Sequence, residues 1–94
     1  MNEPIVESTG NVFADLGFDP GEAAILQMRA KLMSDLRAYI ESKGMTQVKV
    51  TEQFSIAQSR VTDLVHGRWE KFSLETLIML ETKAGRQVEL EFAT

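Results

Sequence analysis

The sequence predicts an all-α domain with a short β-strand at its C-terminal end, and three observations predict it. The chain has 94 residues, of which 44% are hydrophobic, enough for one compact core and too few for two. Between residues 19 and 85, apolar side chains recur at spacings of three and four, as they do along amphipathic helices. After Gly85 the spacing changes to alternate residues, the pattern of a half-buried strand.

The composition excludes several classes of protein. The absence of cysteine excludes disulfides, thiol catalysis and cysteine-rich zinc sites, and the single histidine, His66, is too little for most histidine metal sites. The longest apolar runs, 23–26 and 77–80, are far shorter than the roughly 20 residues that cross a bilayer. The first ten residues contain two glutamates and no basic residue, unlike a targeting peptide. We therefore expect a cytoplasmic protein with no membrane contact, no metal, no cofactor and no catalytic residues.

Residues 1–18 are expected to form an N-terminal arm that is partly disordered. Residues 1–10 contain Pro4, Ser8, Thr9 and Gly10 and few apolar side chains. The next eight residues differ, because four of them are large and apolar and need burial, which predicts that 11–18 docks on the domain or on a second subunit. These four are Val12, Phe13, Leu16 and Phe18.

A long first helix is expected to follow. Asp19 is a suitable N-cap, Pro20 suits the first helical position and Glu22 the third. No helix breaker occurs until Gly44, which with Lys43 before it is typical of a helix end. The apolar face of this helix contains Ile25, Met28, Leu32, Met33, Leu36, Tyr39 and Ile40.

Three shorter helices are expected at 46–54, 57–66 and 73–84, so that the helical domain spans 19–85. The last segment, 86–94, alternates Val88, Leu90 and Phe92 with polar residues and is predicted as the strand. One strand needs a partner, and three candidates remain open: the Val12–Phe13 segment, the same strand of a second subunit, or another protein.

The net charge of −4 is unevenly distributed along the chain. Residues 1–26 contain five acidic residues and no basic one, which gives −5. Residues 27–54 contain five basic and three acidic residues, which gives +2, and 55–72 contain three basic and two acidic, which gives +1. Residues 73–94 contain two basic and four acidic residues, which gives −2. The middle of the chain therefore has the positive charge that a phosphate backbone attracts, and the acidic ends suit a cationic protein.

Residues 46–66 have the apolar spacing of two short helices that cross through a three-residue turn. Counted from Gln47, apolar residues fall at the fourth, eighth, tenth, fifteenth and eighteenth positions, which two such helices must bury where they cross. These residues are Val50, Phe54, Ile56, Val61 and Leu64. The polar residues left over on the second helix are expected to be exposed.

The run from Met45 to Gly67 resembles the helix-turn-helix of XRE/Cro-type phage and bacterial repressors. With the long helix, Asn11 to Phe18 and the following GRWEKFSLETL segment, nearly the whole chain after residue 10 resembles the short HigA-like antitoxins encoded beside RelE/HigB-type toxins. The resemblance implies a five-helix, phage-repressor-like domain. It also implies a homodimeric, sequence-specific repressor that autoregulates a toxin-antitoxin operon, with two recognition helices about 34 Å apart on a pseudo-palindromic operator.

Three positions depart from the family pattern. Thr51 stands where a small alanine is usual, and its hydroxyl is expected to bond to the carbonyl four residues earlier. Ser55 replaces the turn glycine, which costs about 1 to 2 kcal/mol if the residue is left-handed. Ala57 replaces a Ser or Thr cap worth about 1 kcal/mol.

The second helix of the unit supplies the candidate base contacts, because an α-helix fits the major groove. Gln58 suits adenine, Ser59 suits either base type, and Arg60 suits guanine or a phosphate. Gln47 resembles the family glutamine that bonds a phosphate, and Asp63 is expected rather to orient Arg60 or Arg68 than to read cytosine. The full expected set is Gln47, Lys49, Gln58, Ser59, Arg60, Thr62, Asp63, Arg68 and Lys71.

Two alternatives to the antitoxin role remain open at this stage. One is a stand-alone phage-like regulator that binds DNA in the same way and has no toxin. The other is a protein-interaction module that has lost DNA binding, which the acidic balance, Ser55 and Ala57 favour. An enzyme is disfavoured, because the chain lacks an activated nucleophile and a metal-ligand set.

Overall fold

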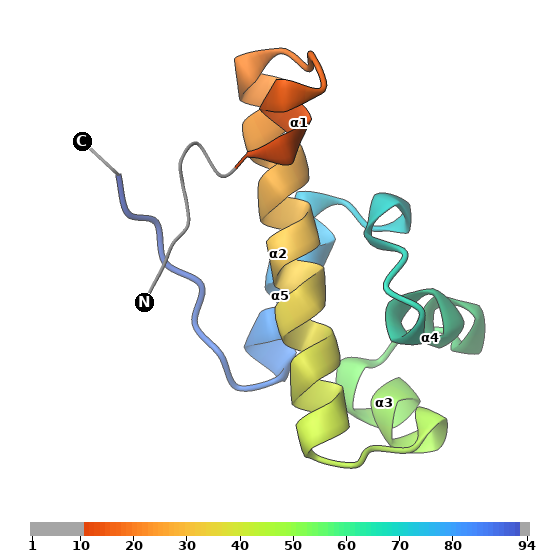
Figure 1. Ribbon diagram of the computed structural model, residues 1–94. Coiled ribbons are helices and arrows are strands. Elements are labelled where there is room, and N and C mark those ends of the chain that lie inside the picture. The colour runs from red at the N-terminus through yellow and green to blue at the C-terminus, as the bar shows by residue number, and fades with distance from the viewer. Residues whose placement is uncertain (1–10, 93–94) are drawn as a thin grey trace.

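The longest element of the computed structural model is helix α2 (Pro20–Ser42), which runs from one end of the molecule to the other (Figure 1). The structure describes residues 11–92, so the prediction of disorder for 1–10 lies outside the described residues. The predicted ends of α2 are confirmed, since Asp19 Oδ2 accepts from the Gly21 backbone N–H at 3.1 Å and Gly44 has a φ of +57°. Such a φ favours glycine, which has no Cβ to strain it.

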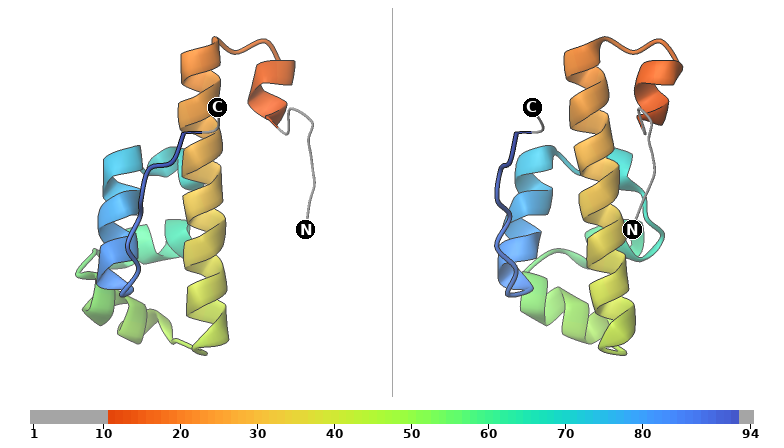
Figure 2. Two further views of the ribbon diagram at one scale, coloured as in Figure 1. Left: turned by 90° about the vertical axis from the view of Figure 1, so that its left-hand side faces the viewer. Right: turned by 60° about the vertical axis from the view of Figure 1, so that its left-hand side comes forward.

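The three shorter helices are confirmed as α3 (Gln47–Phe54), α4 (Gln58–Val65) and α5 (Leu74–Lys83). Thr46 caps α3 by accepting from Lys49 N at 3.2 Å, and Ser73 caps α5 by accepting from Thr76 N at 3.2 Å. A short 3-10 turn, η2 (Trp69–Lys71), joins α4 to α5. Figure 2 shows that α3 and α4 lie together beside the C-terminal half of α2, with α5 alongside.

One hydrophobic core joins these helices. Its buried members come from α2, α3, α4, the end of η2 and α5, and are Met33, Leu36, Ile40, Val50, Phe54, Val61, Leu64, Phe72, Leu77 and Leu80. Of the apolar face predicted for the long helix, Leu32 and Tyr39 are partly buried, whereas Ile25 and Met28 remain exposed. The core therefore covers the C-terminal part of α2 more fully than the part where Ile25 and Met28 lie.

The long helix is not the first helix, which corrects the predicted order. A short helix, α1 (Val12–Asp15), precedes it, because Asn11 Oδ1 accepts from the backbone N–H groups of Phe13 and Ala14. Asn11 Nδ2 also donates to the Ala23 carbonyl at 3.2 Å, which ties α1 to the start of α2. Phe13 lies edge to face against Trp69, with ring centres 5.5 Å apart, so this segment docks on its own domain.

The predicted C-terminal strand is wrong for the described part of the tail. Residues 86–92 form no strand, and they run back from α5 as an irregular segment (Figures 1 and 2). The physical reason is that a strand needs a ladder partner, and the Val12–Phe13 candidate is helical. Leu90 and Phe92 are 81% and 83% exposed, so the alternating apolar side chains find no core within residues 11–92.

Candidate DNA-binding site

The two helices α3 and α4 meet through a tight turn at Ser55. This residue is left-handed, with φ 55° and ψ 47°, the conformation that the sequence analysis treated as strained. Val50, Phe54, Val61 and Leu64 are fully buried at the crossing, which confirms four of the five positions predicted there, and Ile56 is partly buried. The turn and the buried residues fix the relative direction of the two helices.

Two further departures from the family pattern behave as expected. Thr51 Oγ1 donates to the Gln47 carbonyl at 2.9 Å, one turn earlier in α3. Ala57 is the N-cap of α4 and supplies no side-chain hydrogen bond. The backbone N–H groups in the first turn of α4 therefore receive no hydrogen bond from the N-cap side chain and can donate to another partner.

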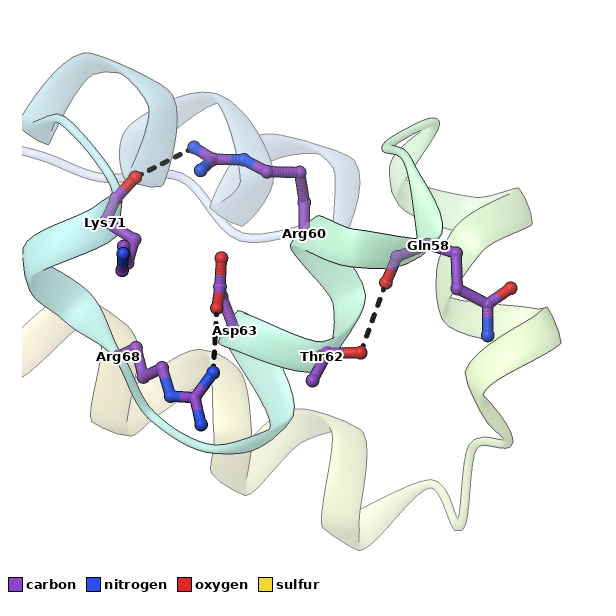
Figure 3. Close-up of polar contacts among 6 residues, drawn as sticks. All are labelled: Gln58, Arg60, Thr62, Asp63, Arg68 and Lys71. Atoms are coloured by element: carbon purple, nitrogen blue, oxygen red, sulfur yellow. Dashed lines mark hydrogen bonds and ion pairs between the residues drawn. The ribbon is translucent and has the colours of Figure 1, made fainter.

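Two of the predicted contact residues lie together where the start of α4 meets the start of α3. Gln58 Nε2 donates to Gln47 Oε1 at 3.4 Å, which links the first residue of α4 to the first residue of α3. Both side chains and that of the neighbouring Ser59 are exposed. Thr62, one turn further along α4, donates to the Gln58 carbonyl at 3.4 Å (Figure 3).

Arg60 points the other way. Its Nη2 donates to the Lys71 carbonyl at 2.9 Å (Figure 3). Its guanidinium lies 4.4 Å from the centre of the Phe72 ring. A cation over an aromatic face is stabilised by about 0.5 to 2 kcal/mol. Arg60 therefore ties α4 to the loop before α5, and reading a base would require it to leave these partners.

The charges on the loop side of α4 are partly neutralised. Arg68 Nη1 lies 3.2 Å from Asp63 Oδ1, which confirms that Asp63 orients an arginine. Lys49 on α3 and Lys71 in η2 are exposed. Among the predicted contact residues, these two lysines therefore present positive charge to solvent without an ion-pair partner in residues 11–92.

Arg29 is a residue that the sequence analysis missed. It lies on the face of α2 that carries Met33 and Leu36, one turn before Met33, and a charged residue on an apolar face was the available signal. Its Nε donates to the Phe72 carbonyl at 2.9 Å and its Nη2 to the Glu70 carbonyl at 3.1 Å. Arg29 therefore holds the loop that carries Lys71.

Arg37 was also missed, and it supports the end of α4. Its Nε donates to the Val65 carbonyl at 3.2 Å, in the last turn of α4. The guanidinium packs against Gly67, where an added Cβ would lie 3.0 Å from Nη1. Gly67 has a φ of +70°, a backbone conformation that favours glycine, and an added Cβ would also displace the flexible end of Arg37.

Two other kinds of feature are absent from the described residues, a metal-ligand cluster and a membrane-spanning helix. Within 11–92, no group of three His, Asp or Glu side chains is placed to hold a metal ion. None of the helices in this part of the chain is long and apolar enough to span a membrane.

Comparison with known proteins agrees with this geometry. The model of a family described as a helix-turn-helix domain matches residues 12–92, which includes every element of the structure. A search of curated proteins finds no match. The chain therefore belongs to the helix-turn-helix domain family.

Proposed function

We propose that the protein is a sequence-specific DNA-binding repressor that reads bases with the start of α4. The observation that carries this proposal is the exposed pair of Gln58 and Gln47, joined at 3.4 Å across the starts of the two helices. A glutamine placed in this way can offer its amide to adenine N6 and N7 in the major groove. Ser59 lies beside Gln58 and is the second base contact of the proposal.

The backbone contacts of the proposal come from residues around this pair. Gln47 and Lys49 at the start of α3 bind one phosphate strand, and Thr62, Arg68 and Lys71 bind the other. Arg60 acts through the loop, because its guanidinium holds the Lys71 carbonyl. Asp63 acts through Arg68, with which it is paired.

Fluorescence anisotropy with duplex DNA from upstream of the protein's own gene tests the readout. Gln58→Ala is expected to weaken binding by about 1 to 3 kcal/mol and to relax preference at one base pair. Arg60→Ala is expected to weaken all sequences alike, since Arg60 positions the loop. Gln27→Ala, on α2 and outside α3, α4 and residues 86–92, is the matched control and leaves affinity unchanged. Binding that is insensitive to the Gln58→Ala, Arg60→Ala double substitution contradicts the proposal.

The proposal includes a homodimer, because one eight-residue helix contacts only one half-site. We place the dimer contact at residues 86–92, because the alternating apolar side chains there are not buried against the rest of residues 11–92. An antiparallel pair of these tails gives each its missing ladder partner. Leu90→Asp is expected to yield a monomer in light scattering, whereas Leu16→Asp, at a 70% exposed leucine outside the tail, is not. The opposite result would move the contact to the 11–18 segment.

The proposal further assigns the protein to the cytoplasm as the antitoxin of a RelE-type operon, without catalytic activity. Its support is the acidic surface at the start of the described chain, where Asp15, Asp19 and Glu22 are exposed near Leu16 and Phe18. Such a surface suits a small basic toxin. Co-expression with the product of a neighbouring gene for a small basic protein is expected to give a complex. DNA binding without such a gene or complex identifies a stand-alone regulator.

A second candidate is a protein-interaction module that no longer binds DNA. The observation that favours it is that Arg60 and Arg68 are both engaged within the chain, which reduces the free positive charge beside α4. The anisotropy experiment separates the two, since this candidate predicts no salt-sensitive binding to any duplex.

A further inference from the structure

Glu81 on α5 is the one buried charged residue among the described residues, with 2% of its surface exposed. Neither of its carboxylate oxygens accepts a hydrogen bond from a donor within residues 11–92. An ionised carboxylate in this state costs several kcal/mol, whereas a protonated one costs far less. A buried carboxyl group that no donor satisfies needs an explanation that the DNA-binding proposal does not supply.

The neighbours of Glu81 come from α2 and from the chain just after α5. Asp35 on α2 binds Arg86, whose Nη1 lies 2.7 Å from both carboxylate oxygens. The backbone N–H of Arg86 donates to the Glu81 carbonyl at 2.9 Å, and its guanidinium lies 5.5 Å from the centre of the Tyr39 ring. Arg86 is therefore the point at which the tail is fastened to α2.

These surroundings change the acidity of Glu81. Burial raises its pKa to about 7, a hydrogen bond from the protonated group to Asp35 and the negative charge of Asp35 add to the rise, and the positive charge of Arg86 opposes it. Asp35 and Arg86 are themselves about two-fifths exposed and remain in contact with water. The Asp35–Arg86 ion pair is thus accessible to water, whereas the carboxyl group of Glu81 is buried.

We propose that Glu81, Asp35 and Arg86 form a proton-operated latch that holds the tail against α2. When Glu81 is protonated, the Arg86 guanidinium binds only the Asp35 carboxylate, and this ion pair holds the start of the tail against α2. When Glu81 gives its proton to water, two carboxylates compete for one guanidinium. Arg86 then turns toward Glu81, its bond to Asp35 and its place over Tyr39 are lost, and the start of the tail is released.

The latch also borders the helix-turn-helix unit. The Tyr39 hydroxyl accepts from Gln53 Nε2 of α3 at 2.9 Å, and the same nitrogen donates to the Lys83 carbonyl at 3.1 Å. Lys83 Nζ donates to the Phe54 carbonyl at 3.0 Å, so its charge is directed at the end of α3. The charged groups that act on Glu81 are thus Asp35 on α2 and Arg86. Tyr39 connects Arg86 to Gln53 of α3.

Nuclear magnetic resonance of the full chain between about pH 5.5 and 8.5 tests the latch. The Glu81 side-chain carbon is expected to titrate near neutral pH, and the amide shifts of residues 86–92 are expected to follow with the same midpoint. Glu81→Gln, of the same size and without charge, is expected to hold the tail in its low-pH state throughout. Glu75→Gln, at an exposed position of the same helix, is the matched control and keeps the wild-type midpoint.

Substitutions at the two charged neighbours of Glu81 are expected to shift its titration midpoint in opposite directions. Asp35→Asn is expected to lower the midpoint, because it removes a neighbouring negative charge and frees Arg86. Arg86→Gln is expected to raise the midpoint of the Glu81 carbon, because it removes the positive charge. His66 is present in all variants, so any transition that it causes survives in Glu81→Gln. A Glu81 carbon that titrates as in an unfolded chain, or a tail midpoint that persists in Glu81→Gln, overturns the latch.

Discussion

Ser55 is the position where a single substitution most directly tests the strain in the helix-turn-helix. Its φ of 55° and ψ of 47° place a residue with a Cβ in the left-handed region, which costs about 1 to 2 kcal/mol. The side chain is exposed, so its removal uncovers no core. Glycine removes the strain but adds about 0.4 to 1 kcal/mol of unfolded-state entropy. Ser55→Gly is therefore expected to raise the free energy of unfolding by about 0.5 to 1 kcal/mol.

Thermal unfolding followed by circular dichroism measures this change. For a domain of this size, about 1 kcal/mol corresponds to a rise of about 4 to 8 °C in Tm, so a rise of about 2 to 8 °C is expected. Ser34→Gly is the matched control, because Ser34 is exposed within α2 and has ordinary helical geometry. This control is expected to lose about 0.5 kcal/mol. If both variants lose stability, the left-handed serine is not strained and the reasoning is refuted.

Three further predictions concern the residues that support the site. Gly67→Ala is expected to cost about 1 to 3 kcal/mol in urea unfolding, since the added Cβ would lie 3.0 Å from Arg37 Nη1 at a φ of +70°; an unchanged midpoint would mean that the loop yields without cost. Arg29→Ala is expected to cost about 2 kcal/mol, because the Phe72 and Glu70 carbonyls lose a charged donor; Lys31→Ala, at an exposed position of the same helix, should stay within about 0.5 kcal/mol of wild type. The contribution of Glu81 to the free energy of unfolding is expected to be fully present below its ordinary pKa of 4.5 and to be lost as pH rises through about 7. Between these two values only the folded state keeps the proton, so about 3 kcal/mol of stability is lost across this window. Glu81→Gln should flatten this dependence, and a wild-type stability that rises over the same window would contradict the assignment.

Much of the fold follows from short-range patterns in the sequence. Asp19, Thr46 and Ser73 each stand as an N-cap where the sequence predicts a helix start, because capping depends on residues within one turn. The buried residues of the α3–α4 crossing were predictable in the same way, since the helical period fixes which side chains share a face. The short helix α1 was missed although Asn11 is a good cap, because only one turn follows it.

The sequence predicts a set of contact residues for the candidate site, but it does not predict the directions of their side chains. Gln47 and Gln58 are brought together, as an exposed pair, by the crossing of two helices. Arg60 is directed instead to the Lys71 carbonyl and the Phe72 ring, which lie eleven and twelve residues away in the chain. No local pattern encodes such a contact, so the base-reading role of Arg60 remains a prediction that the binding experiments test.

The sequence by itself determined helices α2 to α5, the N-caps of α2, α3 and α5 and the buried residues of the α3–α4 crossing, because each depends on periodicity and on neighbours within one turn. It predicted a strand at 86–94 from alternation alone, but a strand forms only where another backbone supplies a ladder, and residues 11–92 supply none. Only the tertiary structure placed Arg29 and Arg37 under the loop and buried Glu81 beside Asp35 and Arg86. Hydrogen bonding and burial of charge depend on groups from distant parts of the chain, and those groups meet only after the helices have packed.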